Sequence, residues 1–458
     1  MKIGYACTPL STSLKTTRKF ALTSYNEELL KTTISRNLLD LYKILEFNNK
    51  LGIKLFRISS NIIPFGSHSI NTFNWPEYFS DELKSIGEFI KKNNLRVSMH
   101  PGQYTVLNSP NDEIVHKAIE DLNYHTSLLD SMGLNAEHKI ILHVGGVYDS
   151  KIESTERFMN NYTLLSKSIR NRLIIENDEK NYSFSDVLNI CKTINAPMVF
   201  DNLHNECFGD NSYTLDKLFE LAKSTWANEK CNMKVHYSQQ DIKKKKGSHS
   251  PTIFIEDFFK YYSVAKNYDL DIMLEVKDKD FSAVKIINLI KESQNALTEI
   301  DILMEIERYK LYFTEKGEDT FGKAKDIILF NGIKDFYLYV DSLYYKKPTS
   351  TSTNKALVEG FKLIEENQLP FIINSSENVN TPLDIYTVKE LIMENKAWFL
   401  DKVWIRFTYF IGNNRKILSF FMLCPIIYCI YMIILTIFYS AITMIISDFF
   451  KLITEVFK

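Results

Sequence analysis

The sequence predicts a (β/α)8 TIM barrel over residues 1–295, followed by a helical extension and a C-terminal transmembrane helix. Short runs rich in Ile, Val, Leu and Met alternate eight times with segments of helical period, as βα units require. At least six consecutive runs end in or just before His, Asp or Glu. A doubly wound open sheet would gather its site near one switch point, whereas a closed barrel brings all the strand ends together. The distribution of these side chains therefore favours the barrel.

The predicted strands share a length of four to six residues and a mostly apolar composition. They are residues 2–6, 54–58, 95–99, 139–144, 173–176, 198–201, 234–237 and 272–276. The predicted helices between them repeat apolar residues every three or four positions, as Leu30, Ile34 and Leu38 do in the first. They are residues 29–51, 81–93, 111–133, 153–169, 183–194, 214–226, 253–265 and 282–293.

Residues 296–400 are expected to form a helical extension. Helical patterns recur at 296–317, 323–345, 355–367 and 384–396, and the polar stretch KKPTSTSTN at 346–354 is typical of a flexible linker. No residues with catalytic spacing fall in this region. The extension is therefore interpreted as a spacer or packing module.

The region 401–458 is predicted to anchor the chain in a membrane. Residues 417–447 contain no charged side chain and exceed the length of about 20 residues that a spanning helix needs. Arg406, Arg415 and Lys416 precede this segment, and the positive-inside rule then places the barrel on the cytoplasmic side. We expect a catalytic domain tethered to the inner face of the membrane.

Composition limits the other partners and the compartment. A formal net charge of −1 over 458 residues gives no overall attraction to nucleic acid, so such a partner needs a local basic patch. The six cysteines form no CxxC pair, which indicates reduced thiols in the cytosol. The start, MKIGYACTPL, has the pattern of a strand and not that of a secretory signal.

Eight potential metal ligands are expected at the C-terminal rim of the barrel. They are His100, His143, Glu176, Asp201, His204, His236, His249 and Glu275. This number of nitrogen and oxygen donors exceeds what one ion can use, so we predict two or three divalent ions, with Zn or Mn favoured by the donor types. No nucleotide cofactor is expected. His116, His125 and His138 are predicted to be structural, whereas His68 lies on the rim side as a contact to substrate or to a ligand.

Lys234 is predicted to point into the barrel beneath His236, because residues two apart in a strand share a face. Burial of an unpaired ammonium is costly. Lys234 should therefore have a carboxylate partner such as Glu275 or a lowered pKa. A neutral amine at this position could also be carboxylated by dissolved CO2.

A cluster of two or three ions suits phosphodiester hydrolysis, whereas a sugar isomerase would leave several of these donors unused. Basic residues also flank the rim, with Lys15, Arg18 and Lys19 in the first loop and Lys243, Lys244, Lys245 and Lys246 between His236 and His249. Tyr5, Gln103 and Tyr104 are expected at the mouth, where they either stack on bases or pack the rim. The pattern predicts a DNA-cutting enzyme.

Motifs along the whole barrel region resemble the UV damage endonuclease family, a relative of the endonuclease IV group. They are GYACTP at the start, RISSNIIPFGSH at 57–68, SMHPGQY at 98–104, LHVGG at 142–146, IEND at 175–178, FDNLHN at 200–205, KVHYS at 234–238 and GSHS at 247–250. The resemblance implies a manganese cluster and a nick immediately 5′ to UV photoproducts or other distorting lesions in double-stranded DNA. The products would be a 3′-hydroxyl and a 5′-phosphate.

Matching motif by motif, the resemblance implies the same eight ligands, a modified lysine at Lys234 and a lesion-probing pair at Gln103 and Tyr104. Glu176, His236, Lys234 and Glu275 are the expected catalytic residues, and His68 is grouped with the DNA contacts. Pro9 departs from the polar residue expected after GYACT, which puts the DNA contact of the first loop in doubt. The alternatives are another metal-dependent barrel enzyme, such as an abasic-site endonuclease or a sugar isomerase, and a non-catalytic membrane-tethered DNA-binding protein.

Overall fold

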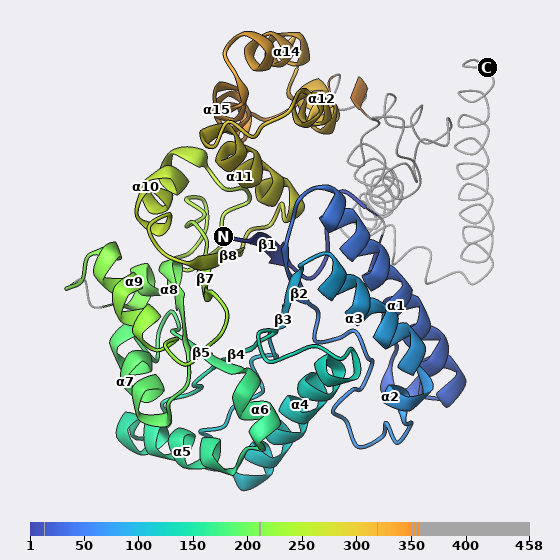
Figure 1. Cartoon of the computed structure of the whole chain (residues 1–458), viewed down its shortest axis with the longest axis vertical. Helices are drawn as coiled ribbons and strands as arrows, with labels where there is room; N and C mark the ends of the chain where they lie inside the picture. Colours follow the sequence, from blue (N-terminus) through green and yellow to red (C-terminus); the bar gives the residue numbers. More distant parts are fainter. Residues whose placement is uncertain (13, 210–211, 318, 350–351, 353–354, 357–458) are drawn as a thin grey trace, which may run out of the picture. The chain divides into compact units, whose positions relative to one another are not determined.

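The computed structural model describes residues 1–12, 14–209, 212–317, 319–349, 352 and 355–356. Eight parallel strands form a closed barrel in the order β1 to β8, with β8 pairing back to β1, and helices surround it (Figure 1). The strands are β1 Ile3–Ala6, β2 Leu55–Ile58, β3 Arg96–Met99, β4 Ile140–His143, β5 Leu173–Glu176, β6 Met198–Asp201, β7 Met233–Tyr237 and β8 Leu270–Leu274. The predicted barrel is confirmed. The last strand begins and ends two residues earlier than expected, so Glu275 lies directly after it.

Eleven α-helices and one 3-10 helix accompany the barrel strands in the described part of the chain. They are η1 Leu22–Ser24, α1 Glu27–Lys50, α2 Trp75–Tyr78, α3 Ser80–Lys92, α4 Asp112–Ser131, α5 Lys151–Leu164, α6 Lys167–Arg172, α7 Phe184–Ile194, α8 Asn202–Phe208, α9 Leu215–Ser224, α10 Ile255–Ala265 and α11 Asp280–Ser293. The short helices α2 and α8 were not predicted. The helix predicted at 153–169 is divided, because Leu165 is extended and buried while Ser166 caps α6 through the backbone N–H of Ile169.

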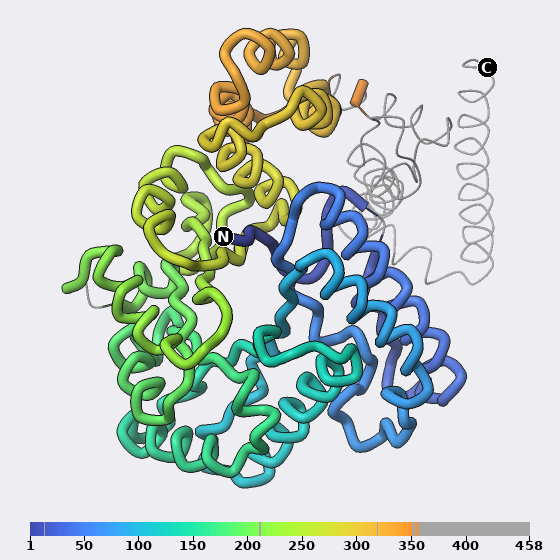
Figure 2. The backbone as a smooth tube through the Cα atoms, in the orientation of Figure 1, coloured from blue at the N-terminus to red at the C-terminus, as the bar shows by residue number. Residues whose placement is uncertain are grey.

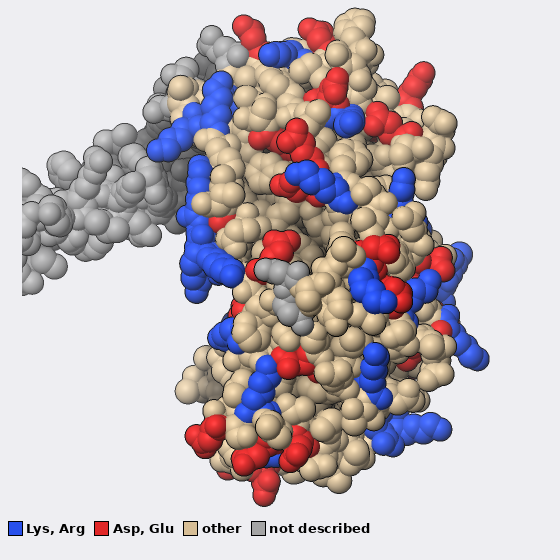
Figure 3. Space-filling model, turned by 90° about the vertical axis from the view of Figure 1, so that its left-hand side faces the viewer, with Lys and Arg blue, Asp and Glu red and all other residues tan. Residues whose placement is uncertain are grey.

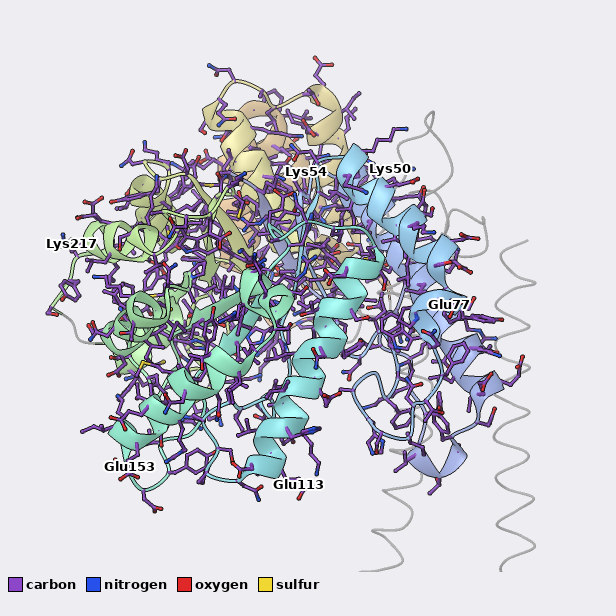
Figure 4. The ribbon with its side chains drawn as sticks, turned by 60° about the horizontal axis from the view of Figure 1, so that its bottom comes forward. Lys50, Lys54, Glu77, Glu113, Glu153 and Lys217 are labelled. Carbon is purple, nitrogen blue, oxygen red and sulfur yellow. The ribbon has the colours of Figure 1, made fainter. Side chains whose placement is uncertain are left out.

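The strands begin at one end of the barrel and finish at the other. Figure 4 shows Lys50, the last residue of α1, and Lys54, just before β2, at the opposite end from Glu113 and Glu153, which lie in the first turns of α4 and α5. The second end is therefore the one at which the strands finish and the helices begin. Ligand sites of such barrels are built there.

The extension forms four helices, which are α12 Glu299–Arg308, α13 Lys310–Lys316, α14 Thr320–Phe330 and α15 Ile333–Leu343. Each of the first two helical segments predicted there is split into two helices, with Gly332 at φ +95° before α15. Figure 2 shows the extension following α11, and the hydrogen bond from Asn288 to the Tyr337 hydroxyl (3.1 Å) ties α11 to α15. The linker predicted at 346–354 is only partly described. The helices predicted at 355–367 and 384–396 lie outside the described residues, apart from 355 and 356.

The predicted fold is wrong in its last part, the C-terminal transmembrane helix. Across the described residues, no helix is both long enough and apolar enough to cross a bilayer. The longest of them, α1, has the length but carries charged side chains throughout. The segment 417–447 lies outside the described residues, so no observation supports the span. The membrane partner and the inner-face tether, which depended on it, are withdrawn.

A buried ion pair joins distant strands at the N-terminal end of the barrel. The Arg96 guanidinium on β3 donates to the Asp271 carboxylate on β8 at 2.9 Å, and both side chains are 3% exposed or less. Arg96 also donates to the carbonyl of Asn232, while Asp271 accepts from the backbone N–H of Lys2. These bonds connect the start of β1 with β3 and β8, and neither partner was singled out in the sequence.

Asp271→Ala should lower the free energy of unfolding by about 3–5 kcal/mol, because it leaves the Arg96 guanidinium buried without its counter-charge. The measurement is urea denaturation followed by circular dichroism. Asp269→Ala is the matched control, since the Asp269 side chain is 87% exposed two residues earlier, and it should change the value by less than about 0.5 kcal/mol. Equal stabilities of the two variants would contradict the role of the pair.

His138 lies at this same end, as its predicted structural role requires. Its Nδ1 accepts a hydrogen bond from the backbone N–H of Val97 at 3.1 Å, and the ring is 2% exposed. Burial, helped by the nearby Arg172 and Arg96, lowers the pKa of His138 to about 3. The imidazole is therefore neutral in the folded protein at any mildly acidic pH.

His138→Gln should weaken the loss of stability on acidification. An unfolded histidine takes up a proton near pH 6.5, whereas the folded one does not until about pH 3, so the folded state loses stability as pH falls between these values. Between pH 7 and pH 5 the wild type should lose about 2 kcal/mol more than the variant. Denaturation curves at both pH values test this, with His116→Gln on the exposed face of α4 as control. Parallel losses in wild type and His138→Gln would contradict the assignment.

Candidate metal centre

Glu176 lies at the centre of the candidate site. Its carboxylate, at the end of β5, is fully buried. One oxygen lies 2.5 Å from Nδ1 of His236, and the other lies 3.1 Å from Nε2 of His100 and 3.5 Å from Nε2 of His143. The strand register supplies part of this arrangement, because His143 on β4 pairs directly with Glu176.

Three groups of donors share the Glu176 carboxylate, and within each group the ligand atoms lie no more than 4.8 Å apart. The groups are His100, His143 and Glu176; Glu176, Asp201 and His204; and Glu176, His236 and Glu275. All the predicted ligands except His249 occur in them. His249 lies at the margin, with its Nδ1 3.9 Å from the Glu275 carboxylate. Donors from six strand ends thus meet in one place, as expected.

The hydrogen bonds of two histidines suit cation binding. Nδ1 of His100 donates to the Pro101 carbonyl at 3.0 Å, which leaves the Nε2 lone pair facing the Glu176 carboxylate. Nδ1 of His204 likewise donates to the Asn177 carbonyl at 2.9 Å. Metal-binding histidines commonly donate their second nitrogen to a carbonyl in this way. A cation would relieve the repulsion between the His100 lone pair and the carboxylate.

Two buried polar atoms of the predicted ligands have no hydrogen-bond partner among the described residues. They are Nδ1 of His143 and one carboxylate oxygen of Asp201. Such atoms are costly to bury unless something binds them. The residues therefore fit a cluster of divalent cations, with nitrogen and oxygen donors pointing inward.

The charges of the site are strongly coupled. Burial raises the pKa of Asp201 to about 7. Burial opposes the protonation of His204, but the neighbouring Asp201 and Glu176 raise its pKa to about 9. Burial would also raise the pKa of Glu176, yet His236 and His143 lower it well below its ordinary value. A bound cation would take over the balancing of these carboxylates and displace the proton from His204.

Arg57 is a residue of the site that sequence reasoning missed. It lies on β2, where its guanidinium contacts a Glu275 oxygen at 2.5 Å and Nε2 of His236 at 2.9 Å. Because arginine only donates, Nε2 of His236 accepts, and the ring proton then lies on Nδ1 toward Glu176. Binding of a cation through Nδ1 would require that proton to leave. An arginine inside an apolar strand was the signal that could have revealed it.

Lys234 is fully buried on β7 beneath His236, as predicted. Its ammonium donates to the Ser98 hydroxyl on β3. Burial lowers the pKa of Lys234 well below its usual value, and the nearby Arg57 and Arg96 act in the same direction. The expected pairing with Glu275 is not found, because Glu275 pairs with Arg57. Of the two expected outcomes, the structure has the lowered pKa.

Hydrogen bonds among neighbouring loops hold the donors in place. Asp201 caps α8 by accepting from the backbone N–H of His204 at 2.8 Å, and its own N–H donates to the Asn177 side chain. The Ser60 hydroxyl donates to the His100 carbonyl and contacts Nε2 of the buried His125 at 2.9 Å. The structural role predicted for His125 thus includes support of the loop that carries His100.

The residues expected to meet DNA divide into two kinds. Gln103 and Tyr104 are exposed in the loop after β3, with Tyr104 at 82%, and His68 is exposed after β2. Tyr5 requires a correction. Its side chain is fully buried, its hydroxyl donates to Asn48 on α1, and its ring packs edge-on against Phe56. It therefore faces the helix layer and not the mouth of the barrel.

The predicted basic residues are exposed except for the half-buried Arg18, and several of them already have partners. Lys246 donates to the Cys207 carbonyl at 2.9 Å, and the Lys243 ammonium lies 3.8 Å from the centre of the Tyr345 ring. In the first loop, Arg18 pairs with Asp40 at 2.7 Å. Figure 3 shows one face of the molecule, where Lys and Arg side chains gather along the left margin and also lie among Asp and Glu over the rest of the face.

The comparisons with known proteins agree with one another. The model of the family "UV-endonuclease UvdE" matches residues 1–311. A UV DNA damage endonuclease of Clostridium perfringens (strain 13 / Type A) is 47% identical over 371 residues, which cover 80% of this chain and 89% of the relative. One of Bacillus cereus (strain G9842) is 34% identical over 301 residues, covering 63% and 94%. The crystal structure of SacUVDE has 42% identity and a TM-score of 0.61, covering 65% of this chain and all of that chain.

Glu176→Gln should reduce the affinity for divalent cations by more than about 100-fold, because the shared carboxylate serves all three donor groups. The measurement is a Mn²⁺ titration with the free ion followed by electron paramagnetic resonance. Glu156→Gln, on the exposed face of α5, is the control and should bind like the wild type. Mn²⁺ affinity of Glu176→Gln within a few-fold of the wild type would contradict the shared site.

Proposed function

Because the chain belongs to the UV-endonuclease UvdE family, we propose that it is a DNA repair endonuclease that nicks double-stranded DNA immediately 5′ to UV photoproducts and other distorting lesions. The cut would leave a 3′-hydroxyl and a 5′-phosphate. The single observation that supports this proposal most strongly is the set of three donor groups sharing Glu176. A site with so many inward nitrogen and oxygen donors suits phosphodiester hydrolysis assisted by several ions.

The proposed cofactor is a cluster of two or three divalent ions, with Mn favoured and Zn as the alternative. Its ligands would be His100, His143, Glu176, Asp201, His204, His236, His249 and Glu275. When bound, such ions lower the pKa of a water, hold a phosphoryl oxygen and neutralise the leaving alkoxide. The mixture of imidazole and carboxylate donors is compatible with either metal.

The protein's own residues would hold and orient this chemistry. Glu176 accepts from Nδ1 of His236, and Arg57 holds Glu275 and His236 in position. Because its pKa is lowered, Lys234 would supply a neutral amine beneath His236. Carboxylation of this amine would add another anionic group to the site. Glu176, His236, Lys234 and Glu275 are therefore the proposed catalytic set.

The rim would bind the DNA. Lys243, Lys244, Lys245 and Lys246 would contact phosphates, which position a duplex without reading its sequence. Gln103 and Tyr104 are exposed beside His100 and would insert at the lesion. Damaged bases are already poorly stacked, so separating them costs less than separating an intact step. This difference would supply selectivity for distorted DNA.

The full-length protein with Mn²⁺ should nick a UV-irradiated duplex and leave an unirradiated one intact, because only the first offers a weakened stack beside Tyr104. Tyr104→Ala should cut the irradiated duplex about 10-fold more slowly, since base stacking on an aromatic ring is worth about 1–3 kcal/mol. Gel electrophoresis of end-labelled strands gives both the rate and the position of the cut.

Phe330→Ala is the control for Tyr104→Ala, because Phe330 on α14 is equally exposed at 83%. Its rate should equal that of the wild type. Cutting of abasic duplex alone would indicate a different DNA lesion class. If the wild type binds DNA without nicking it, and Glu176→Gln binds equally well, the protein is a DNA-binding module and not an endonuclease.

A further inference from the structure

The helical extension is an addition to a barrel that is complete in some relatives. SacUVDE aligns over its whole length with 65% of this chain, whereas the Clostridium perfringens relative aligns over 371 residues. The described extension packs against the barrel domain, because α15 lies beside α10 and α11. The contacts between these helices involve charged groups that the proposed reaction does not use.

Asp341 on α15 is bonded directly to the start of α10. One carboxylate oxygen accepts from the backbone N–H of Ile255 at 2.9 Å, and the other accepts from the Lys285 ammonium of α11 at 2.7 Å. α10 has no side-chain cap of its own, since Phe254 occupies the N-cap position. Asp341 thus supplies from another segment the acceptor that a capping residue normally provides.

Lys285 connects Asp341 to the loop before α10 through further hydrogen bonds. Its side chain is fully buried and also donates to the Ile253 carbonyl at 2.9 Å and to the Thr252 hydroxyl at 3.1 Å. The Thr252 carbonyl in turn accepts from the Ser250 hydroxyl at 2.7 Å. Hydrogen bonds therefore link Asp341 through Lys285 and Thr252 to Ser250, the residue that follows His249.

The same loop, residues 238–254, carries the four lysines as well as His249. Its outer side also meets the extension, because the Phe254 ring stacks on Tyr345 with centroids 5.9 Å apart. The Lys243 ammonium contacts the same ring, 3.8 Å from the Tyr345 centroid. Both the end of the loop at Phe254 and its basic part at Lys243 thus contact Tyr345, just after α15.

We propose that Asp341, acting through Lys285, is a positioning residue for the metal centre and holds the 238–254 loop so that His249 faces Glu275. The extension is on this view a support for one wall of the site, which is more specific than its interpretation as a spacer or packing module. The inference rests on the proposed function only for the role of His249 as a ligand. Partners of ligands typically change metal affinity by about 10–100-fold.

Asp341→Ala in the full-length protein should bind Mn²⁺ about 10-fold more weakly than the wild type. The free ion is followed by electron paramagnetic resonance at a temperature where circular dichroism shows the variant to be folded. The same substitution is then made in a His249→Ala background. If Asp341 acts through His249, its removal should cost little there, because coupled residues are not additive. Asp335→Ala, exposed on the same helix, should bind like the wild type.

Equal weakening in the two backgrounds, or unchanged Mn²⁺ binding by folded Asp341→Ala, would overturn the proposal. If Asp341→Ala does not fold, Asp341→Asn keeps an acceptor for the Ile255 N–H and removes only the charge that faces Lys285, and the same comparison decides. A wild type that binds Mn²⁺ but leaves UV-irradiated DNA intact would refute the proposed function. In that case the coupling between Asp341 and His249 would still be read from the titrations.

Discussion

The constraint on which the structure depends is the burial of the Glu176 carboxylate among imidazole rings from several strands. A buried carboxylate is costly unless positive charge or hydrogen bonds surround it, and here Nδ1 of His236 donates to one oxygen while His100 and His143 flank the other, where a cation would fit. Only a closed barrel of parallel strands can bring these groups together from such separated segments. The buried Arg96–Asp271 pair also stabilises the closed barrel, because it joins β3 to β8 at the opposite end.

Most of the fold could be predicted because its signals are local. Apolar strands and amphipathic helices repeat with their own periods, and these periods placed all eight strands within two residues of their observed bounds. The missed features depend on tertiary contacts. The break at Leu165 arises because the core takes up that side chain, and the shift of β8 arises from its pairing with β7, which begins at Met233 and Leu270. The hydropathy of residues 417–447 concerned a segment that the structure does not describe.

The candidate site was predictable where ligands end strands, since every donor except His249 falls into a compact group. Residues that act from beside the site were not. Arg57 is hidden in a strand of ordinary appearance, and Asp341 lies far along the chain in helices without catalytic spacing. Tyr5 was misplaced because the end of a short strand offers two faces, and its neighbour Asn48 on α1 binds the outward one. Period alone does not choose between the faces.

The pairing of β1 with β8 has a consequence for biosynthesis. The first strand emerges from the ribosome at once but finds its second neighbour only when Leu270–Leu274 has been made, and the last carboxylate of the cluster follows at Glu275. Nascent or truncated chains that end before this point therefore hold an incomplete set of ligands. Under the proposed function, cations would therefore be bound only late in maturation, after the last strand has closed the barrel.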